Sequence, residues 1–188
     1  MDKEDLKELG LELLKLPRMV KQVLESVVRM RELGKELKDA KSVLFLGRNV
    51  GFPIAMEGAL KLKELAYIHA EGFAAGELKH GPIALIEQGQ PVIVVVPSPN
   101  GEDSLHPKVV SNIQEIKARG AKVIAIAEEG DSAGAKSADE VFFVPQTHPF
   151  MAAQLAVLPL QIIALELASA KGLDVDQPRN LAKSVTVE

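Results

Sequence analysis

Three short apolar runs, separated by segments with helical periodicity, limit what this chain can fold into more than any other feature. The runs are 43–46, 92–96 and 123–127, and each is apolar on consecutive residues instead of alternating. Strands that are covered on both faces need that pattern, whereas a strand with one face in water alternates apolar and polar residues. The runs therefore predict buried strands in a sheet with helices on both faces.

The segments between these runs complete an α/β pattern. A fourth apolar run, 141–144, predicts another strand, and the short segment 68–73 predicts a fifth. Helical periodicity covers 53–67, 77–86, 108–119 and 150–171. Strands that alternate with helices favour right-handed crossovers and parallel pairing. We therefore expect a three-layer α/β/α sandwich around a central, mostly parallel five-stranded sheet.

The chain divides into a helical lead-in over residues 1–39, an α/β domain over residues 40–173 and a tail over residues 174–188. Pro17 interrupts the helical pattern of the lead-in, which predicts two helices or one broken helix packed on the domain. The 188 residues suffice for one large core, and no repeat or flexible linker indicates a second domain. Because free termini usually fray, we expect the polar, proline-punctuated tail to lie over another surface.

The composition excludes several kinds of function. The sequence contains no cysteine, which rules out disulfides, thiolate metal sites and thiol nucleophiles. The 22 basic and 26 acidic residues give a net charge of −4, and no basic run is long enough to follow a nucleic acid backbone. Apolar runs fall short of the roughly eighteen residues of a membrane helix, and the charged first residues differ from a signal peptide. We therefore expect a cytoplasmic protein that binds neither nucleic acid nor membrane.

A polar stripe on the helix predicted over 53–67 is the first candidate site. Glu57, Lys61 and Glu64 are spaced i, i+4 and i+7, so they share one face, with the lysine between two carboxylates. Such a stripe is either a solvated ladder of ion pairs or, if it faces a cleft, a general base held ionised by its lysine. In the second case Glu64 is the base. Gly58, which is costly inside a helix, indicates that a backbone or ligand approaches closely there.

Two further residues have both a structural and a chemical interpretation. His80 precedes Gly81 and a proline, where a helix should end, so it is either a helix cap or a functional imidazole. Lys183 in the tail is inert if it is exposed, because its ammonium stays protonated at neutral pH. If the tail covers it, the desolvated amine can act as a nucleophile.

The histidines and acids do not predict a metal site. His69, Glu71, Glu77 and His80 have no spacing that matches a known set of metal ligands. His106 precedes a proline and is predicted to lie in a loop. We therefore expect no metal and no cofactor.

Two loops that follow predicted strands are candidate ligand sites. Residues 47–51 follow the first strand and open a helix, so they form either a tight turn or an anion-binding loop. Their spacing does not fit a dinucleotide or nucleotide motif. The loop over 97–103 is acidic and poor in hydroxyl groups, which disfavours phosphate, and no ligand is expected there.

Three stretches resemble one family over almost the whole chain. They are Leu46–Asn49 with Glu57–Glu64, then Ala74–Pro82, then the tail from Asp176 to Glu188. In this order they resemble the second sugar-isomerase (SIS) half of glucosamine-6-phosphate synthases, the glutamine:fructose-6-phosphate amidotransferases. The resemblance implies a flavodoxin-like SIS fold and a part in converting fructose 6-phosphate and ammonia into glucosamine 6-phosphate. In that family the ammonia comes from an N-terminal glutaminase domain.

The resemblance also implies roles for individual residues. Lys183 would form a Schiff base with the open-chain sugar, and Glu64 would move a proton between its C1 and C2 atoms. Lys61 would assist the base, and Ala182 would contact the sugar through the closing tail. His80 would assist ring opening and reach the site from a neighbouring subunit, so the resemblance implies a homodimer.

The family's full pattern contains more than this chain shows. Its phosphate-binding loops belong to a first SIS subdomain, and the acidic loop over 98–103 does not replace them. The expected partners are thus a sugar phosphate (fructose 6-phosphate or glucosamine 6-phosphate), that first SIS subdomain and the glutaminase domain. We expect the isolated chain to be inactive or weakly active. Two alternatives are a non-catalytic SIS module for sugar-phosphate binding or dimerisation, and a stand-alone isomerase with a site shared between two copies.

Overall fold

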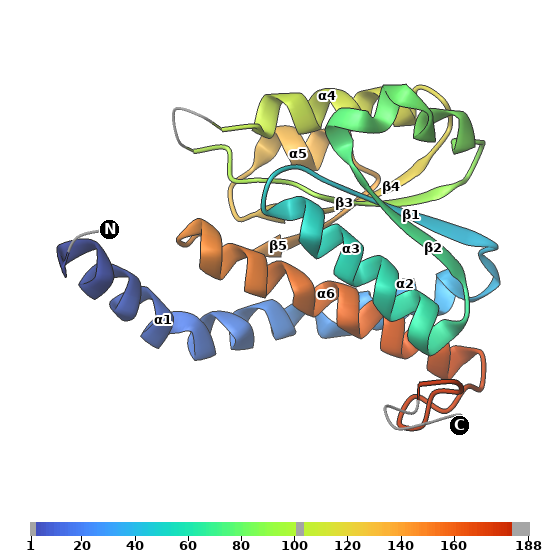
Figure 1. Ribbon diagram of the computed structural model, residues 1–188, viewed down its shortest axis with the longest axis horizontal. Coiled ribbons are helices and arrows are strands. Elements are labelled where there is room, and N and C mark those ends of the chain that lie inside the picture. The colour runs from blue at the N-terminus through green and yellow to red at the C-terminus, as the bar shows by residue number, and fades with distance from the viewer. Residues whose placement is uncertain (1–2, 101–103, 182–188) are drawn as a thin grey trace, which may run out of the picture.

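The centre of the molecule is one parallel five-stranded sheet in the order β2-β1-β3-β4-β5 (Figure 1). A computed structural model describes residues 3–100 and 104–181. The strands are β1 (Ser42–Gly47), β2 (His69–Ala74), β3 (Pro91–Val95), β4 (Lys122–Glu128) and β5 (Glu140–Val144). This strand order is the one found in flavodoxin-like sheets. The predicted three-layer α/β/α sandwich with five parallel strands is thereby confirmed.

Helices cover both faces of this sheet. They are α1 (Lys3–Val23), α2 (Val27–Glu36), α3 (Gly51–Lys61), α4 (His106–Lys117), α5 (Ser132–Ser137) and α6 (Pro149–Ala170). In Figure 1, α4 and α5 lie above the sheet, and α1, α2, α3 and α6 lie below it. The remaining described elements are short turns. Four are 3-10 turns, η1 (Leu24–Ser26), η2 (Leu37–Asp39), η4 (Ala75–His80) and η5 (Pro82–Leu85), and one is a π turn, η3 (Leu62–Ala66).

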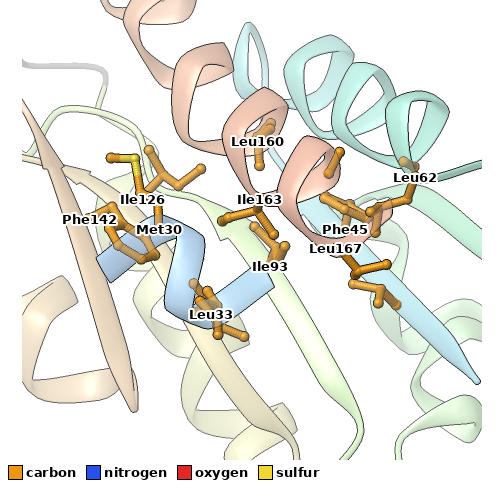
Figure 2. Close-up of a cluster of buried hydrophobic side chains, with 14 of the residues drawn as sticks. Met30, Leu33, Phe45, Leu62, Ile93, Ile126, Phe142, Leu160, Ile163 and Leu167 are labelled. Atoms are coloured by element: carbon orange, nitrogen blue, oxygen red, sulfur yellow. The ribbon is translucent and has the colours of Figure 1, made fainter. Parts of the chain in front are cut away.

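The two faces of the sheet bury separate apolar cores because successive side chains of a strand point to opposite sides. In β1, Val43 and Phe45 join the core under α2, α3 and α6, whereas Leu44 and Leu46 join the core under α4. Figure 2 shows the first core, where Phe45 lies among side chains from α6 and η3. The consecutive apolar runs in the sequence are explained by this double coverage.

Helix α6 is long and apolar enough, by length and composition alone, to cross a membrane, so the expectation that no run reaches that length was wrong. Proline, two glutamines and one glutamate interrupt the run in the sequence and hide its extent. Its buried side chains, among them Leu155, Leu160 and Ile163, pack in the core shared with α2 and α3. This core position explains the buried part of the apolar sequence of α6, which is 44% of its most apolar window (Figure 2).

Three local expectations were also wrong. Helix α1 continues through Pro17, and the helix breaks later, at η1. Pro17 is exposed, so water can reach the carbonyl group that the proline leaves without a hydrogen bond. The segment 77–86 forms the 3-10 turns η4 and η5, because Gly81, at φ 148°, and Pro82 interrupt it. The segment between β4 and β5, for which no helix is predicted, contains α5, whose first turn is capped by the Asp131 carboxylate.

Candidate active site

The carboxyl end of α3 carries the polar stripe, and the structure brings its charges into contact. The Lys61 Nζ lies 2.6 Å from the Glu64 Oε2 and 3.6 Å from the Glu57 Oε1. The hydrogen bond to Glu64 raises the pKa of Lys61, against the opposing effect of partial burial and with added support from the charge of Glu57. Both partners of the short pair are about three-quarters buried, so this pair is not part of a fully solvated ladder.

The residues that follow Lys61 wind wider than an α-helix. Residues Leu62–Ala66 form the π turn η3, and Tyr67 ends it with a left-handed backbone at φ 54°. Leu62 and Ala66 are buried in the core. Because these two side chains point inwards, Glu64 lies on the outer side of the turn and is partly exposed. Single π turns inside helices occur frequently at functional sites, and a positive φ at an aromatic residue stores backbone strain.

The described part of the tail lies against this turn. The Arg179 backbone N–H donates a hydrogen bond to the Tyr67 hydroxyl at 2.8 Å, and the Arg179 guanidinium lies over the tyrosine ring, 4.0 Å from its centre. An open cavity of about 500 Å³ lies here, lined by Lys63, Glu64, Tyr67, Ile68, His69, Arg179, Asn180 and Leu181. The tail was expected to cover another surface, and its described residues do so beside Glu64.

This cavity lies at the amino edge of the sheet. His69, one of its lining residues, is the first residue of β2 and pairs with Ser42, the first residue of β1. Ligands of open α/β sheets usually bind beyond the carboxyl ends of the strands. The Glu64 cavity is therefore on the opposite edge from the usual ligand position.

His80 does not belong to the Glu64 cavity within the described part of the chain. It is exposed at the end of η4, which follows the carboxyl end of β2, whereas the cavity borders the strand's first residue. The structure therefore does not unite His80 with Lys61 and Glu64 in one described site. Lys183 and Ala182 lie outside the described residues.

The structure also bears on the metal ligands, on the loop over 47–51 and on Gly58. Among the described residues, no group of three or more histidine or acidic side chains could hold a metal ion. The loop over 47–51 turns tightly, because a side chain on Gly47 would come within 2.1 Å of the Gly51 carbonyl oxygen, and its residues 48–51 line a second cavity. A side chain on Gly58 would meet Phe45 and Leu160, each at 2.8 Å, so core packing, and not a ligand, requires this glycine.

Sequence reasoning missed two contacts. The partnership of Tyr67 with Arg179 was not predicted, although Tyr67 is the chain's single tyrosine and directly follows the polar stripe. His106 was expected in a loop, but it begins α4 and is buried, with its Nε2 2.8 Å from the Asp131 Oδ2. Partners that are 112 and 25 residues apart leave no local signal in a sequence.

Comparison with known proteins shows the family. Residues 36–171 match the SIS domain family. The chain belongs to the SIS domain family. This range covers all five strands and the helices from α3 to α6, including the Lys61–Glu64 pair.

One relative is named glutamine–fructose-6-phosphate aminotransferase (isomerizing) and comes from Leifsonia xyli. It is 69% identical over 177 residues, which are 94% of this chain and 29% of that protein. A relative of the same name from Corynebacterium efficiens is 64% identical over 92% of this chain and 28% of its own length. The chain thus spans less than a third of the length of these relatives.

A solved structure described as the C-terminal domain of glucosamine-fructose-6-phosphate aminotransferase from Francisella tularensis is similar to this SIS domain. It has a TM-score of 0.85 and 36% identity, and the match covers 94% of this chain and 49% of that one. The match to a region described as C-terminal agrees with the resemblance noted from the sequence. The SIS fold of this chain is thereby supported by both sequence and structure.

Proposed function

We propose that this chain is the C-terminal SIS subdomain of an enzyme that makes glucosamine 6-phosphate from fructose 6-phosphate and glutamine-derived ammonia. The observation that carries the proposal is the Lys61–Glu64 pair at 2.6 Å, placed beside a cavity that the described end of the tail also lines. The names of the relatives and the C-terminal position of the structural match support it. The first SIS subdomain and the glutaminase domain are its proposed partners in the complete enzyme.

In the proposed mechanism Lys183 forms a Schiff base. Its amine condenses with the C2 carbonyl of the open-chain sugar and releases one water molecule. Ammonia then adds to this imine carbon and the lysine amine leaves, which frees Lys183 and gives a C2 imine that carries the ammonia nitrogen. Leu181 lines the Glu64 cavity, and Lys183 follows it by two residues in the sequence, which supports pairing this amine with the Glu64 carboxylate in the proposal. Ala182, between them, would contact the sugar.

Glu64 moves the proton in this mechanism. Its carboxylate takes a proton from C1 and returns a proton to C2, which converts a C2 imine into a C2 amine with a carbonyl group at C1. Lys61 supports this role because its raised pKa keeps it cationic beside Glu64, and the positive charge favours the ionised, proton-accepting carboxylate.

His80 is proposed to act in a second copy of the chain. Its imidazole is exposed and lies away from the described residues of the Glu64 cavity, as expected for a side chain that assists ring opening in a partner's site. A homodimer in the cytoplasm is part of the proposal. Without a phosphate-binding loop to position the sugar, the isolated chain should have weak activity or none, because positioning supplies much of the rate enhancement in such reactions.

Borohydride trapping tests the proposal directly. The chain is incubated with fructose 6-phosphate and sodium borohydride, which reduces a Schiff base to a stable secondary amine, and the modified peptide is identified by mass spectrometry. We expect an adduct at Lys183 that is lost in Lys183→Arg and kept in the matched variant Lys171→Arg. Modification spread over surface lysines, or sugar-phosphate binding without any adduct, would reject the catalytic role and favour a non-catalytic binding module.

A further inference from the structure

The described lining of the Glu64 cavity carries more positive than negative charge. Its charged side chains are Lys63, Arg179 and Glu64. The Glu64 carboxylate is already paired with the Lys61 ammonium at 2.6 Å, so it does not neutralise the two cations of the lining. The chain as a whole, by contrast, has a net charge of −4. The cavity is therefore a positive site on a protein that is negative overall, which favours an anionic ligand.

Neither cation of the lining has an acidic partner within residues 3–100 and 104–181. Arg179 contacts Tyr67, to which its backbone N–H donates and over whose ring its guanidinium lies at 4.0 Å from the centre. The side chain of Lys63 forms no ion pair or hydrogen bond with another described residue. Both residues are exposed, so a ligand in the cavity can reach them.

Tyr67 holds one of these cations in place before any ligand binds. Its ring holds the guanidinium by a cation–π contact, and its hydroxyl group holds the backbone of the same arginine. A side chain that is already ordered loses less conformational entropy on binding than a free one. The planar guanidinium of Arg179 presents N–H groups that match the oxygens of a phosphate, and the Lys63 ammonium adds a point charge.

The size and openness of the cavity also suit a phosphorylated ligand. Its volume of about 500 Å³ is typical of small-molecule sites. A phosphate is strongly hydrated, and at an open site it can keep part of that water while it contacts the two cations. The positive charge of Lys61 beside Glu64 limits the repulsion between this carboxylate and a bound anion.

We propose that Lys63 and Arg179 form a phosphate subsite of the Glu64 cavity, which binds the phosphate group of a phosphate monoester. The proposal rests on the proposed function for the identity of the monoester, an open-chain sugar phosphate. It gives this chain a phosphate contact of its own, in addition to the loops expected in the first SIS subdomain. Two exposed side chains bind phosphate more weakly than a loop of backbone donors, which agrees with weak or absent activity of the isolated chain.

Ligand titrations in the variant Lys183→Arg test the subsite. This variant keeps the charge of the tail but removes the amine that forms the Schiff base, so the titrations report binding alone. Tyr67 is the single tyrosine of the chain, so labelled tyrosine gives NMR ring signals from one residue of the cavity lining. Fructose 6-phosphate, inorganic phosphate and fructose are each added at constant ionic strength, balanced with sodium chloride.

We expect both phosphate compounds to shift the Tyr67 signals in a saturable way, with Kd values of about 1–10 mM. Fructose, which lacks the phosphate, should bind at least about tenfold more weakly. Fructose 6-phosphate and inorganic phosphate should compete for the same site, because both are expected to occupy it through the same group.

Charge variants locate the subsite. Lys63→Gln and Arg179→Gln should each lower the affinity for inorganic phosphate about fivefold. Arg179→Lys should cause a smaller loss, because it keeps the charge but not the planar set of donors. Lys38→Gln, at an exposed lysine of η2 outside the cavity, is the matched control and should leave the affinity unchanged. Lys63→Gln leaves the contact between Tyr67 and Arg179 in place, so it tests the subsite even if Arg179→Gln releases the tail.

Borohydride trapping in the same charge variants, with Lys183 retained, separates this proposal from the proposed function. Saturable phosphate binding without an adduct at Lys183 would support the subsite and reject the Schiff-base chemistry. An adduct that forms at the same rate in the unmodified chain, in Lys63→Gln and in Arg179→Gln would support the chemistry and overturn the subsite.

Three binding results would overturn the subsite directly. Shifts that sodium chloride produces equally would show general screening of charge and no phosphate site. Binding of fructose as tight as that of fructose 6-phosphate would show that the sugar hydroxyl groups, and not the phosphate, are recognised. Unchanged phosphate affinity in both Lys63→Gln and Arg179→Gln would place the bound anion elsewhere on the chain.

Discussion

The contact between Tyr67 and Arg179 gives the sharpest test of how the tail is held beside Glu64. Tyr67→Phe removes only the hydroxyl group that accepts the Arg179 N–H at 2.8 Å, which is worth about 1 kcal/mol. Tyr67→Leu also removes the ring under the guanidinium, a contact worth about 0.5–1 kcal/mol at an exposed site. The population with an undocked tail should therefore rise about fivefold in the first variant and ten- to thirtyfold in the second.

Trypsin measures this population because it cleaves after Arg179 only when the guanidinium has left the tyrosine ring. If docking and undocking are fast, the cleavage rate follows the undocked fraction, so the rates should rise by the same factors. Cleavage after Lys171, the C-cap residue of α6, serves as an internal control. Both replacements keep a non-glycine residue at the positive φ of position 67, so neither relieves the backbone strain.

The result that would refute this reasoning is simple. Equal cleavage rates after Arg179 in the unmodified chain and in both variants would show that the contact does not hold the tail. A rise in both variants at Lys171 as well would mean that the replacements loosen the domain as a whole. The ordered increase from phenylalanine to leucine at Arg179 alone supports a clamp made of one hydrogen bond and one cation–π contact.

Three further predictions concern stability and are checked by urea unfolding. The folded state raises the pKa of Lys61 above its ordinary 10.5, so its pairing stabilises the fold below that pH, and this stabilisation is lost at higher pH. Lys61→Met should therefore remove part of the stability loss seen between about pH 10 and 12. An unchanged pH profile of stability would contradict the pairing. Gly58→Ala should cost about 1–3 kcal/mol by overpacking the core, whereas the matched variant Gly10→Ala, with no atom within 4 Å of its new methyl group, should be neutral or stabilising by up to about 1 kcal/mol. Glu128→Gln removes an unpaired buried charge and should stabilise the chain by about 1–3 kcal/mol, and a loss of stability would show that the carboxylate is satisfied in the fold.

The sheet could be predicted because burial leaves a local record in the sequence. The apolar runs at 43–46, 92–96, 123–127 and 141–144 fall within β1, β4 and β5 and overlap β3. The apolar pattern of β2 in the sequence is weaker. This strand lies at the edge of the sheet and pairs with β1 alone, and several of its residues are not buried. A buried strand can be predicted from the sequence because burial affects all of its consecutive residues.

Short elements were harder to predict because single residues decide them. Helix α5 depends on the cap that Asp131 provides, and the 77–86 segment fails as a helix at Gly81 and Pro82. The π turn has the same apolar spacing as the helix before it, so the sequence does not show where the winding widens. For the site, the spacing of Lys61 and Glu64 predicted their contact, but the tail's position depends on residues that are distant in sequence.

The position of the Lys61–Glu64 pair at the amino edge of the sheet has a consequence for how this fold can change. The pair lies where the chain enters β2, so the connections that leave β3 and β4 can vary in length and composition without displacing it. Selection or engineering could therefore change the loops at the carboxyl edge of the sheet while the Lys61–Glu64 pair at the amino edge stays in place.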